Sequence, residues 1–336
     1  MDERIIPAGK LPADLLARLL GEIPLDDPNI LVGPALGEDA TAIRFADQIL
    51  LFKTDPITFA SDKLAWYLVT INVNDIACMG GIPKYLLATF LLPEGKTSRA
   101  SVEKLFSDLQ KACTSYNITL VGGHTEITYG INRPIAIGFM IGTLAGDTVI
   151  RTSGAGPGDL VLLTKSIPIE GIAVMAQEKA DKLGLDSKSL EKARNLIYDP
   201  GISVLKDAQI ALAQGGVTAM HDPTEGGLAT GLHEIAAACG YGITVKMESI
   251  PILNLAQEIL PRLAIDPLGV LASGSLVVCC KEGFAGKILS AWKKNGIPGS
   301  IIGKITHAKE MILVHEGRMD PLPEFTADEI TKMFSS

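Results

Sequence analysis

The chain has 336 residues, of which 47% are hydrophobic, 20% charged and 5% aromatic, a composition typical of a folded protein with a sizeable buried core. The 30 Lys and Arg residues are outnumbered by 38 Asp and Glu residues, which gives a net charge of −8 and argues against a general affinity for nucleic acid or anionic membranes. The N-terminus lacks the apolar core of a signal peptide, and no apolar stretch approaches the roughly 18 residues that a membrane helix needs. We therefore expect a cytoplasmic protein that binds neither nucleic acid nor membrane.

The five cysteines form no recognisable redox or metal motif. None of Cys78, Cys113, Cys239, Cys279 and Cys280 belongs to a C-x-x-C pair, and five cysteines are too few for a disulfide framework. We expect reduced residues that pack in the core.

The first half of the chain is predicted to contain strands in clusters and few helices. A long apolar segment over 66–79 predicts a buried helix that carries Asn74 and Asp75 and ends at the Gly80-Gly81 pair. Two further helices are expected over 10–22 and 98–116, and strands over 40–45, 48–54, 85–92, 118–121 and 134–144.

The densest cluster of Gly and Pro residues, over 153–159, predicts a domain boundary, with one domain over 1–152 and a second over 153–336. Because the strands of the first half are not each separated by a helix, the pattern favours an α+β fold over a doubly wound parallel sheet. In the second half we expect helices over 171–182, 189–196, 202–214 and 228–239, and strands over 160–164, 243–245, 276–280 and 311–314.

Acidic residues recur beside glycines or inside apolar segments. An ionised carboxylate in apolar surroundings is unfavourable by several kcal/mol unless it is paired or bound to a metal ion, so each of these residues is a candidate for a functional role. Mg²⁺ prefers carboxylate oxygens together with ligand phosphates, and it allows an acidic pocket to hold ATP. The candidate segments are Glu38-Asp39, Lys53-Thr54-Asp55, Asn74-Asp75, Gly122-Gly123-His124-Thr125-Glu126 and Asp222-Pro223-Thr224-Glu225-Gly226-Gly227.

Each segment also has a purely structural interpretation. Acidic turns and helix caps use the same residue types, and a polar residue inside a helix can serve only its local hydrogen bonds. A glycine-rich segment after a strand can be an ordinary loop or a loop whose backbone N–H groups hold phosphate. Glu38-Asp39 and Asp55-Pro56 can each be an acidic turn, and Asp75 can serve only hydrogen bonds within its helix. Residues 122–126 can be either kind of loop, and Asp222 or Thr224 can cap the helix that follows.

Taken in order, these motifs resemble those of the AIR synthetase (PurM)-like superfamily of ATP-dependent enzymes, which includes selenophosphate synthetase, thiamine-monophosphate kinase and the hydrogenase maturation factor HypE. The likeness to HypE is the greatest. The matching segments cover most of the chain: 37–40, 53–55, 74–83, 122–126, 222–228 and 265–268.

The resemblance implies an N-terminal mixed α/β domain that forms a dimeric, β-barrel-like core, and a C-terminal α+β domain, with ATP and Mg²⁺ bound between them in a homodimer. It implies catalytic roles for Asp75 and Asp222. ATP-binding roles fall on Lys53, Asp55, Asn74, Gly122, Gly123, His124 and Thr125, and metal-binding roles on Asp39, Asp75, Glu126 and Asp222. His124 stands where HypE and thiamine-monophosphate kinase carry aspartate.

Departures from the family narrow the expected reaction. HypE ends in a Pro-Arg-Ile-Cys tail whose thiol carries a carbamoyl group, whereas this sequence has no cysteine after Cys280. Selenophosphate synthetase uses a cysteine or selenocysteine near its N-terminus, and the first cysteine here is Cys78. In place of the Asp-Ile-Ser-Asp-Gly signature of thiamine-monophosphate kinase, this sequence has Asp-Pro-Thr-Glu-Gly over 222–226.

We therefore expect ATP- and Mg²⁺-dependent phosphoryl transfer to an oxygen of a small molecule, of the kind an α-ribazole kinase performs. Two alternatives are a HypE-like maturation factor that acts with a protein partner, and an AIR-synthetase-like ATP-dependent cyclisation.

Overall fold

The computed structural model describes residues 11–58, 62–144 and 146–334. The chain divides into two compact units. The first, here called the N-terminal unit, contains residues 27–33 and 39–149; the second, the C-terminal unit, contains residues 1–26, 34–38 and 150–336. Each unit is described by itself.

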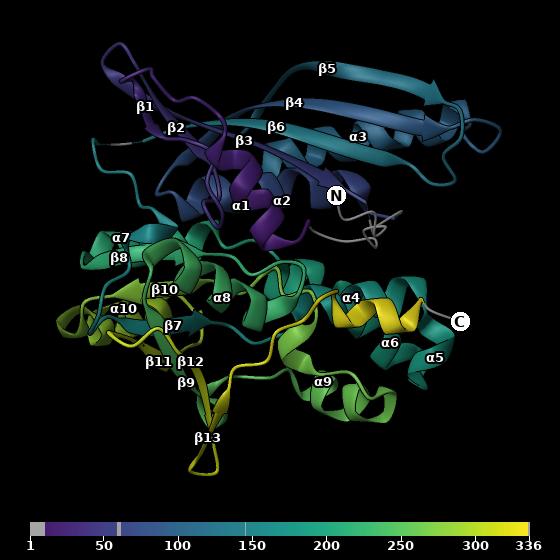
Figure 1. Cartoon of the computed structure of the whole chain (residues 1–336). Coiled ribbons are helices and arrows are strands. Elements are labelled where there is room, and N and C mark those ends of the chain that lie inside the picture. The colour runs from purple at the N-terminus through teal and green to yellow at the C-terminus, as the bar shows by residue number, and fades with distance from the viewer. Residues whose placement is uncertain (1–10, 59–61, 145, 335–336) are drawn as a thin grey trace, which may run out of the picture. The chain divides into compact units, whose positions relative to one another are not determined.

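The N-terminal unit is built on a six-stranded sheet with the order β1-β2-β3-β6-β4-β5, and α2 and α3 lie against one face of it (Figure 1). Neighbouring strands are antiparallel except β4 and β5, which are parallel because α3 connects them. Strand bounds are β1 Ile30–Val32, β2 Thr41–Phe45, β3 Gln48–Ile57, β4 Ile82–Pro93, β5 Thr119–Thr128 and β6 Ile135–Thr143, and the helices are α2 Leu64–Cys78 and α3 Arg99–Ser115.

Helix α2 is buried along nearly its whole length, including its polar residues Asn72, Asn74 and Asp75. It approaches the sheet closely because glycines face it: a Cβ atom on Gly138 would lie 2.4 Å from the side-chain nitrogen of Asn72, and one on Gly142 would lie 2.4 Å from Ile76. The Asn72 amide donates to the Leu68 carbonyl oxygen at 2.9 Å. The helix therefore brings polar groups into the interior of the unit.

Helix α3 begins at a capping box in which the Ser98 hydroxyl accepts the Ser101 N–H at 3.1 Å and the Ser101 hydroxyl accepts the Ser98 N–H at 3.0 Å. It leads into β5 at the edge of the sheet, where all but the last residue of the strand are exposed.

The C-terminal unit contains a seven-stranded sheet with the order β13-β12-β9-β11-β7-β10-β8, in which only β12 and β9 are parallel. Its strands are β7 Leu160–Thr164, β8 Val217–His221, β9 Gly242–Lys246, β10 Val277–Cys280, β11 Gly299–Thr306, β12 Met311–His315 and β13 Arg318–Pro321. One face of the central strands packs with helix α8, Gly227–Cys239, in a core that includes Val161, Leu163, Leu232, Ile235 and Val277.

The remaining helices of this unit surround the sheet. Within the unit, α4, α5, α6 and α9 gather at the end away from β8 and α10 (Figure 1). Trp292 of α10 is fully buried and its indole N–H donates to the Asp207 carbonyl oxygen of α7 at 2.9 Å, which joins these two helices. Helix bounds are α1 Ala13–Gly21, α4 Ile169–Glu178, α5 Ala180–Leu183, α6 Ser187–Asn195, α7 Leu205–Gln214, α9 Asn254–Ile259 and α10 Glu282–Lys294.

The α+β class is confirmed, since both sheets are mixed and mostly antiparallel. In the described residues both sheets are open and neither closes into a barrel, so the dimeric barrel-like core stays a prediction. No helix in the described part of the chain has the length and apolar character needed to cross a membrane.

Two local predictions are wrong. The segment 122–126 is not a loop, because it lies within β5, where its backbone pairs with β4. Asp55-Pro56 does not open a turn, because β3 continues through it to Ile57, paired with β6.

Candidate active site

The N-terminal unit contains a lysine between two carboxylates. The Lys53 ammonium on β3 lies 3.3 Å from Asp75 Oδ1 on α2 and 3.7 Å from Asp55 Oδ2 on β3. Residues 53 and 55 are two apart on a strand and therefore point to the same face, which is the face covered by α2. The sequence prediction placed all three residues in the site, and the structure brings them together.

Asp75 is held in place by the burial of its helix. Only 4% of Asp75 is exposed, and its neighbour Asn74 is fully buried. A carboxylate in this environment needs a partner, and Lys53 supplies a positive charge at ion-pair distance. The ion pair can orient the Lys53 ammonium.

A second buried carboxylate of this unit belongs to Asp39, which precedes β2 and is 7% exposed. An oxygen of Asp39 and the Cys78 sulfur at the end of α2 lie within 4.8 Å of one another. Cys78 was expected to be only a core residue, and it is buried. No local pattern predicts that Cys78 lies close to Asp39, because the two residues are far apart in the chain.

Gly123 of β5 allows two backbones to come unusually close. It has φ +146°, and a Cβ atom there would lie 1.9 Å from the Ala88 carbonyl oxygen of β4. No side chain fits in that space, so position 123 requires glycine. The chain therefore uses Gly123 in strand pairing.

His124 and Glu126 lie on the exposed strand, and His124 Nε2 is 3.1 Å from Glu126 Oε2. The Thr128 hydroxyl also donates to Glu126 at 2.9 Å. These hydrogen bonds, first from Thr128 and then from His124, lower the pKa of Glu126. Glu126 thus differs from Asp39 and Asp75, because about half of its side chain is exposed.

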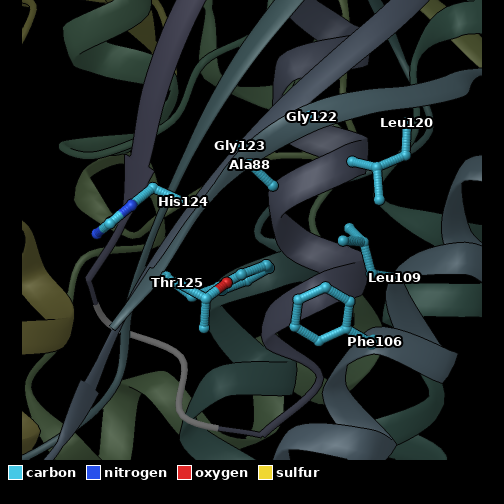
Figure 2. A pocket seen from close by; sticks show the side chains of 9 residues that line it. Ala88, Phe106, Leu109, Leu120, Gly122, Gly123, His124 and Thr125 are labelled. Carbon is cyan, nitrogen blue, oxygen red and sulfur yellow. The ribbon is translucent and has the colours of Figure 1, made fainter. Parts of the chain in front are cut away.

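A cavity of about 370 Å³ lies between β4, β5 and α3. Figure 2 shows Phe106 and Leu109 of α3 facing Leu120 of β5 around it, while the His124 ring points away from these side chains. The lining is mostly apolar, so the cavity suits an apolar group better than a triphosphate.

In the C-terminal unit, the segment 222–227 forms a fixed turn between β8 and α8. Asp222 is 2% exposed. The preceding His221 is also buried, with Nε2 2.9 Å from Glu234 Oε2. The Gly226 N–H donates to Asp328 Oδ2 at 2.8 Å, which ties the turn to the C-terminal segment.

Glu170, at the start of α4 in the C-terminal unit, was not among the predicted site residues. It is 6% exposed, and burial, the largest effect, raises its pKa to about 8. The negative charges of Glu225, Asp328 and Asp222 raise the pKa further, while Ser273 lowers it. Glu170 stands in the apolar segment Pro168-Ile169-Glu170-Gly171-Ile172, so the criterion applied to the other buried acids would have found it.

The predicted site residues are thus divided between the two units. Lys53, Asp55 and Asp75 form one cluster. Asp39 lies buried near Cys78, Gly122 to Glu126 lie on the edge strand, and Asp222 belongs to the C-terminal unit. That Asp39, Asp75 and Asp222 hold one metal ion stays a prediction.

Sequence comparisons identify the same family on both halves of the chain. Residues 37–144 match "AIR synthase related protein, N-terminal domain", and residues 156–316 match "AIR synthase related protein, C-terminal domain".

Individual relatives cover most of the chain. A putative hydrogenase expression/formation protein of Methanocaldococcus jannaschii is 25% identical over 318 residues, which span 91% of this chain and 91% of that protein. The carbamoyl dehydratase HypE of Rhizobium leguminosarum bv. viciae is 28% identical over 282 residues, 80% of this chain and 77% of that protein.

Solved structures have the same fold. HypE in complex with ATP matches with a TM-score of 0.73 at 22% identity, over 93% of this chain and 96% of that one. HypE in a HypE–HypF complex matches with a TM-score of 0.74 at 22% identity, over 86% of this chain and 94% of that one. AaThiL complexed with AMPPCP and TMP matches with a TM-score of 0.70 at 18% identity, over 93% of this chain and 94% of that one.

Proposed function

Because the chain belongs to the AIR synthase-related family, we propose that it is an ATP-dependent enzyme that transfers the γ-phosphoryl group to the oxygen of an amide-type group, such as a carbamoyl group. The C–O bond then breaks and phosphate leaves, while the amide nitrogen gives up its two protons and forms a C≡N bond to the same carbon. The observation that carries this proposal is that relatives named carbamoyl dehydratase HypE align with most of the chain. The structure of HypE with ATP supports ATP as the phosphoryl donor.

Catalysis of this reaction depends mainly on positioning the phosphates and neutralising their charge. Phosphoryl transfer proceeds through a transition state whose charge spreads over the phosphoryl oxygens. Lys53, which Asp55 and Asp75 orient, is proposed to contact the phosphates, and Asn74 to help position them. The bond between the γ-phosphorus and the ADP oxygen breaks as the bond to the acceptor oxygen forms.

The carboxylates fit Mg²⁺ by their chemistry. Mg²⁺ takes oxygen ligands and favours a few carboxylates together with phosphate oxygens, and Asp39, Asp75 and Asp222 are all buried carboxylates. These three residues are proposed to hold the ion, which would neutralise phosphate charge when bound. Glu126 fits less well, because it is half exposed and already accepts hydrogen bonds from His124 and Thr128.

The edge strand β5 is proposed to contribute to the ATP site through Gly122, Gly123, His124 and Thr125. In the part of the chain that the structure describes, no strand pairs with the outer side of β5. This supports the predicted homodimer, since strand pairing across a two-fold axis satisfies such an edge. The HypE–HypF structure supports a protein partner as a second form of assembly.

A second candidate is a small-molecule kinase, which retains the phosphoryl group on its product. The likeness in fold to AaThiL, solved with AMPPCP and TMP, favours it. The kinase and the amide-activating enzyme share the first step and differ in what happens to the phosphorylated oxygen.

Mass spectrometry of products distinguishes the two functions. The protein is incubated with ATP, Mg²⁺ and a panel of compounds that carry either carbamoyl or hydroxyl groups, and ADP release is followed. Loss of one water from a carbamoyl compound, with release of free phosphate, is the expected result. A stable phosphorylated alcohol would favour the kinase, and the absence of ADP release with every compound would contradict both.

A further inference from the structure

Glu170 is a buried acid at the start of α4. Its Oε2 atom has no hydrogen-bond partner among the residues that the structure describes, and the same is true of the Oγ atom of fully buried Ser273. The Ser273 hydroxyl is close enough to lower the pKa of Glu170, but no hydrogen bond of normal geometry joins the two groups. A buried polar group without a hydrogen-bond partner is unfavourable for folding.

Other buried charges of the same unit do have partners. The Lys165 ammonium lies 2.9 Å from Asp207 Oδ1 and donates to the carbonyl oxygens of Ser203 at 2.8 Å and Gly274 at 2.7 Å. Asp328, which is 7% exposed, accepts N–H groups of Gly226 and Ile330, both at 2.8 Å. In these two cases a buried charge has a charged or backbone partner, whereas Glu170 Oε2 has no hydrogen-bond partner in the described part of the chain.

The surroundings of Glu170 attract positive charge. The three charged groups that act on it, Glu225, Asp328 and Asp222, are all acidic. Asp222 and Glu225 come from the turn after β8, and Asp328 comes from the C-terminal segment that binds this turn. Glu225 is only half buried, so the acidic cluster extends from the interior toward the surface.

The backbone around the cluster is fixed by close packing. The Gly171 N–H donates to the Leu271 carbonyl oxygen at 2.9 Å, and a Cβ atom on Gly171 would lie 2.2 Å from Val270. The Ala272 N–H donates to the Thr224 carbonyl oxygen at 3.3 Å. These contacts join the start of α4, the segment 270–273 and the turn 222–227, so the polar groups are held in place before any ligand binds.

We propose that Glu170, Ser273 and Glu225 form a binding site for a positively charged nitrogen group, an ammonium or a guanidinium, carried by the small molecule on which the enzyme acts. Such a group offers several N–H donors, which would satisfy the free Glu170 oxygen and the Ser273 hydroxyl. Its charge would compensate the acidic groups around it. The assignment to the acceptor molecule rests on the proposed function, whereas the binding of the cation does not.

A matched pair of probes tests the site without any turnover. Methylguanidinium and methylurea have nearly the same shape and similar N–H donors and differ in charge. Their dissociation constants for the full chain are measured by ligand-observed NMR, with and without a non-hydrolysable ATP analogue. We expect methylguanidinium to bind at least about 10-fold more tightly than methylurea, because hydrogen bonds to charged groups are the stronger ones.

Variants then assign the preference to these residues. Glu170→Gln keeps the shape of the side chain and should remove most of the preference for the cation, and Glu225→Gln should reduce it in part. Glu191→Gln is the control, because Glu191 is an exposed acid on α6 of the same unit. If Glu170→Gln does not fold, Glu225→Gln and Ser273→Ala carry the test.

Equal binding of the two probes would overturn the proposal, as would a cation preference that survives both Glu170→Gln and Glu225→Gln. It would also be overturned if Mg²⁺ at low concentration bound in a Glu170-dependent manner and excluded methylguanidinium, since the cluster would then be a metal site. Failure of the proposed function is a separate result: cation binding that depends on Glu170, with no ATP-dependent turnover of any compound, would contradict the enzyme activity and retain the site.

Discussion

The Lys53 ammonium and the Asp75 carboxylate lie 3.3 Å apart and join the central strand β3 to the buried helix α2. The pair is almost fully shielded on the Asp75 side, where 6% of the side chain is exposed, and partly open on the Lys53 side, where 21% is exposed. A cation that is held from the interior and remains accessible is suited to binding an anionic ligand. This geometry links the most buried acid of the N-terminal unit to a group that phosphate can reach.

Replacing Asp75 with Asn should nearly abolish ATP turnover. The substitution removes the charge that orients Lys53 and one proposed metal ligand while it keeps the shape of the side chain. We expect kcat for ADP release to fall by at least about 100-fold, the size of effect seen when one electrostatic contact to a transition state is lost. Asp108→Asn on the surface of α3 is the control, since Asp108 pairs with the neighbouring lysines Lys104 and Lys111 of the same helix. Normal turnover by a folded Asp75→Asn protein would contradict the site assignment.

Replacing Gly123 with Ala should destabilise the N-terminal unit, whereas Gly122→Ala should be tolerated. A Cβ atom at position 123 would lie 1.9 Å from the Ala88 carbonyl oxygen at a φ of +146°, whereas at position 122 the nearest atom is 3.9 Å away. We expect Gly123→Ala to reduce the free energy of unfolding by more than about 1 kcal/mol. Urea denaturation of the two variants checks this. Equal free energies of unfolding for the two variants would contradict the close approach of β5 to β4 at Gly123.

Local patterns were sufficient to predict the helices that carry most of the chemistry. The apolar segment that ends at Gly80-Gly81 predicted α2 to within two residues, because the signal lies in consecutive residues. Strand β11, over Gly299–Thr306, and helix α10, over Glu282–Lys294, were missed. Both contain two glycines, which weaken the local preference, and the fold forms them through packing against distant partners such as β7 and α7.

The site was only partly accessible from the sequence for the same reason. The predicted strand over 48–54 contained Lys53 but ended before Asp55. The distance of both residues from Asp75 depends on how α2 packs on the sheet. Glu170 meets the criterion of an acid inside an apolar segment, but it lies outside all of the motif segments that resemble the family. The extension of β5 through residues 122–126 depends on hydrogen bonds to β4, which no pattern within the segment encodes.

Removing Lys165 should be strongly destabilising. Lys165 is 6% exposed, and burial lowers its pKa while Asp207 raises it. Lys165→Met would leave the Asp207 carboxylate buried beside no cation, so we expect a loss of about 3–5 kcal/mol in the free energy of unfolding. The double variant Lys165→Met/Asp207→Leu should recover part of the loss, because neither charge is then left alone. Guanidinium chloride denaturation measures all three proteins, and a single variant as stable as the parent would contradict a structural role for the pair.

Glu170 should make the protein less stable as the pH rises from about 5 to 8. Its pKa in the folded state is about 8, above the ordinary value of 4.5, so between these values the folded protein binds more protons than the unfolded chain. The free energy of unfolding must then decrease with pH across this interval, by on the order of a few kcal/mol in total. Glu170→Gln cannot titrate and should flatten this part of the profile, whereas Glu191→Gln should leave it unchanged. Chemical denaturation at a series of pH values provides the comparison, and a parent profile that rises over the interval, or one that Glu170→Gln leaves unaltered, would show that the Glu170 carboxyl is ionised in the folded protein.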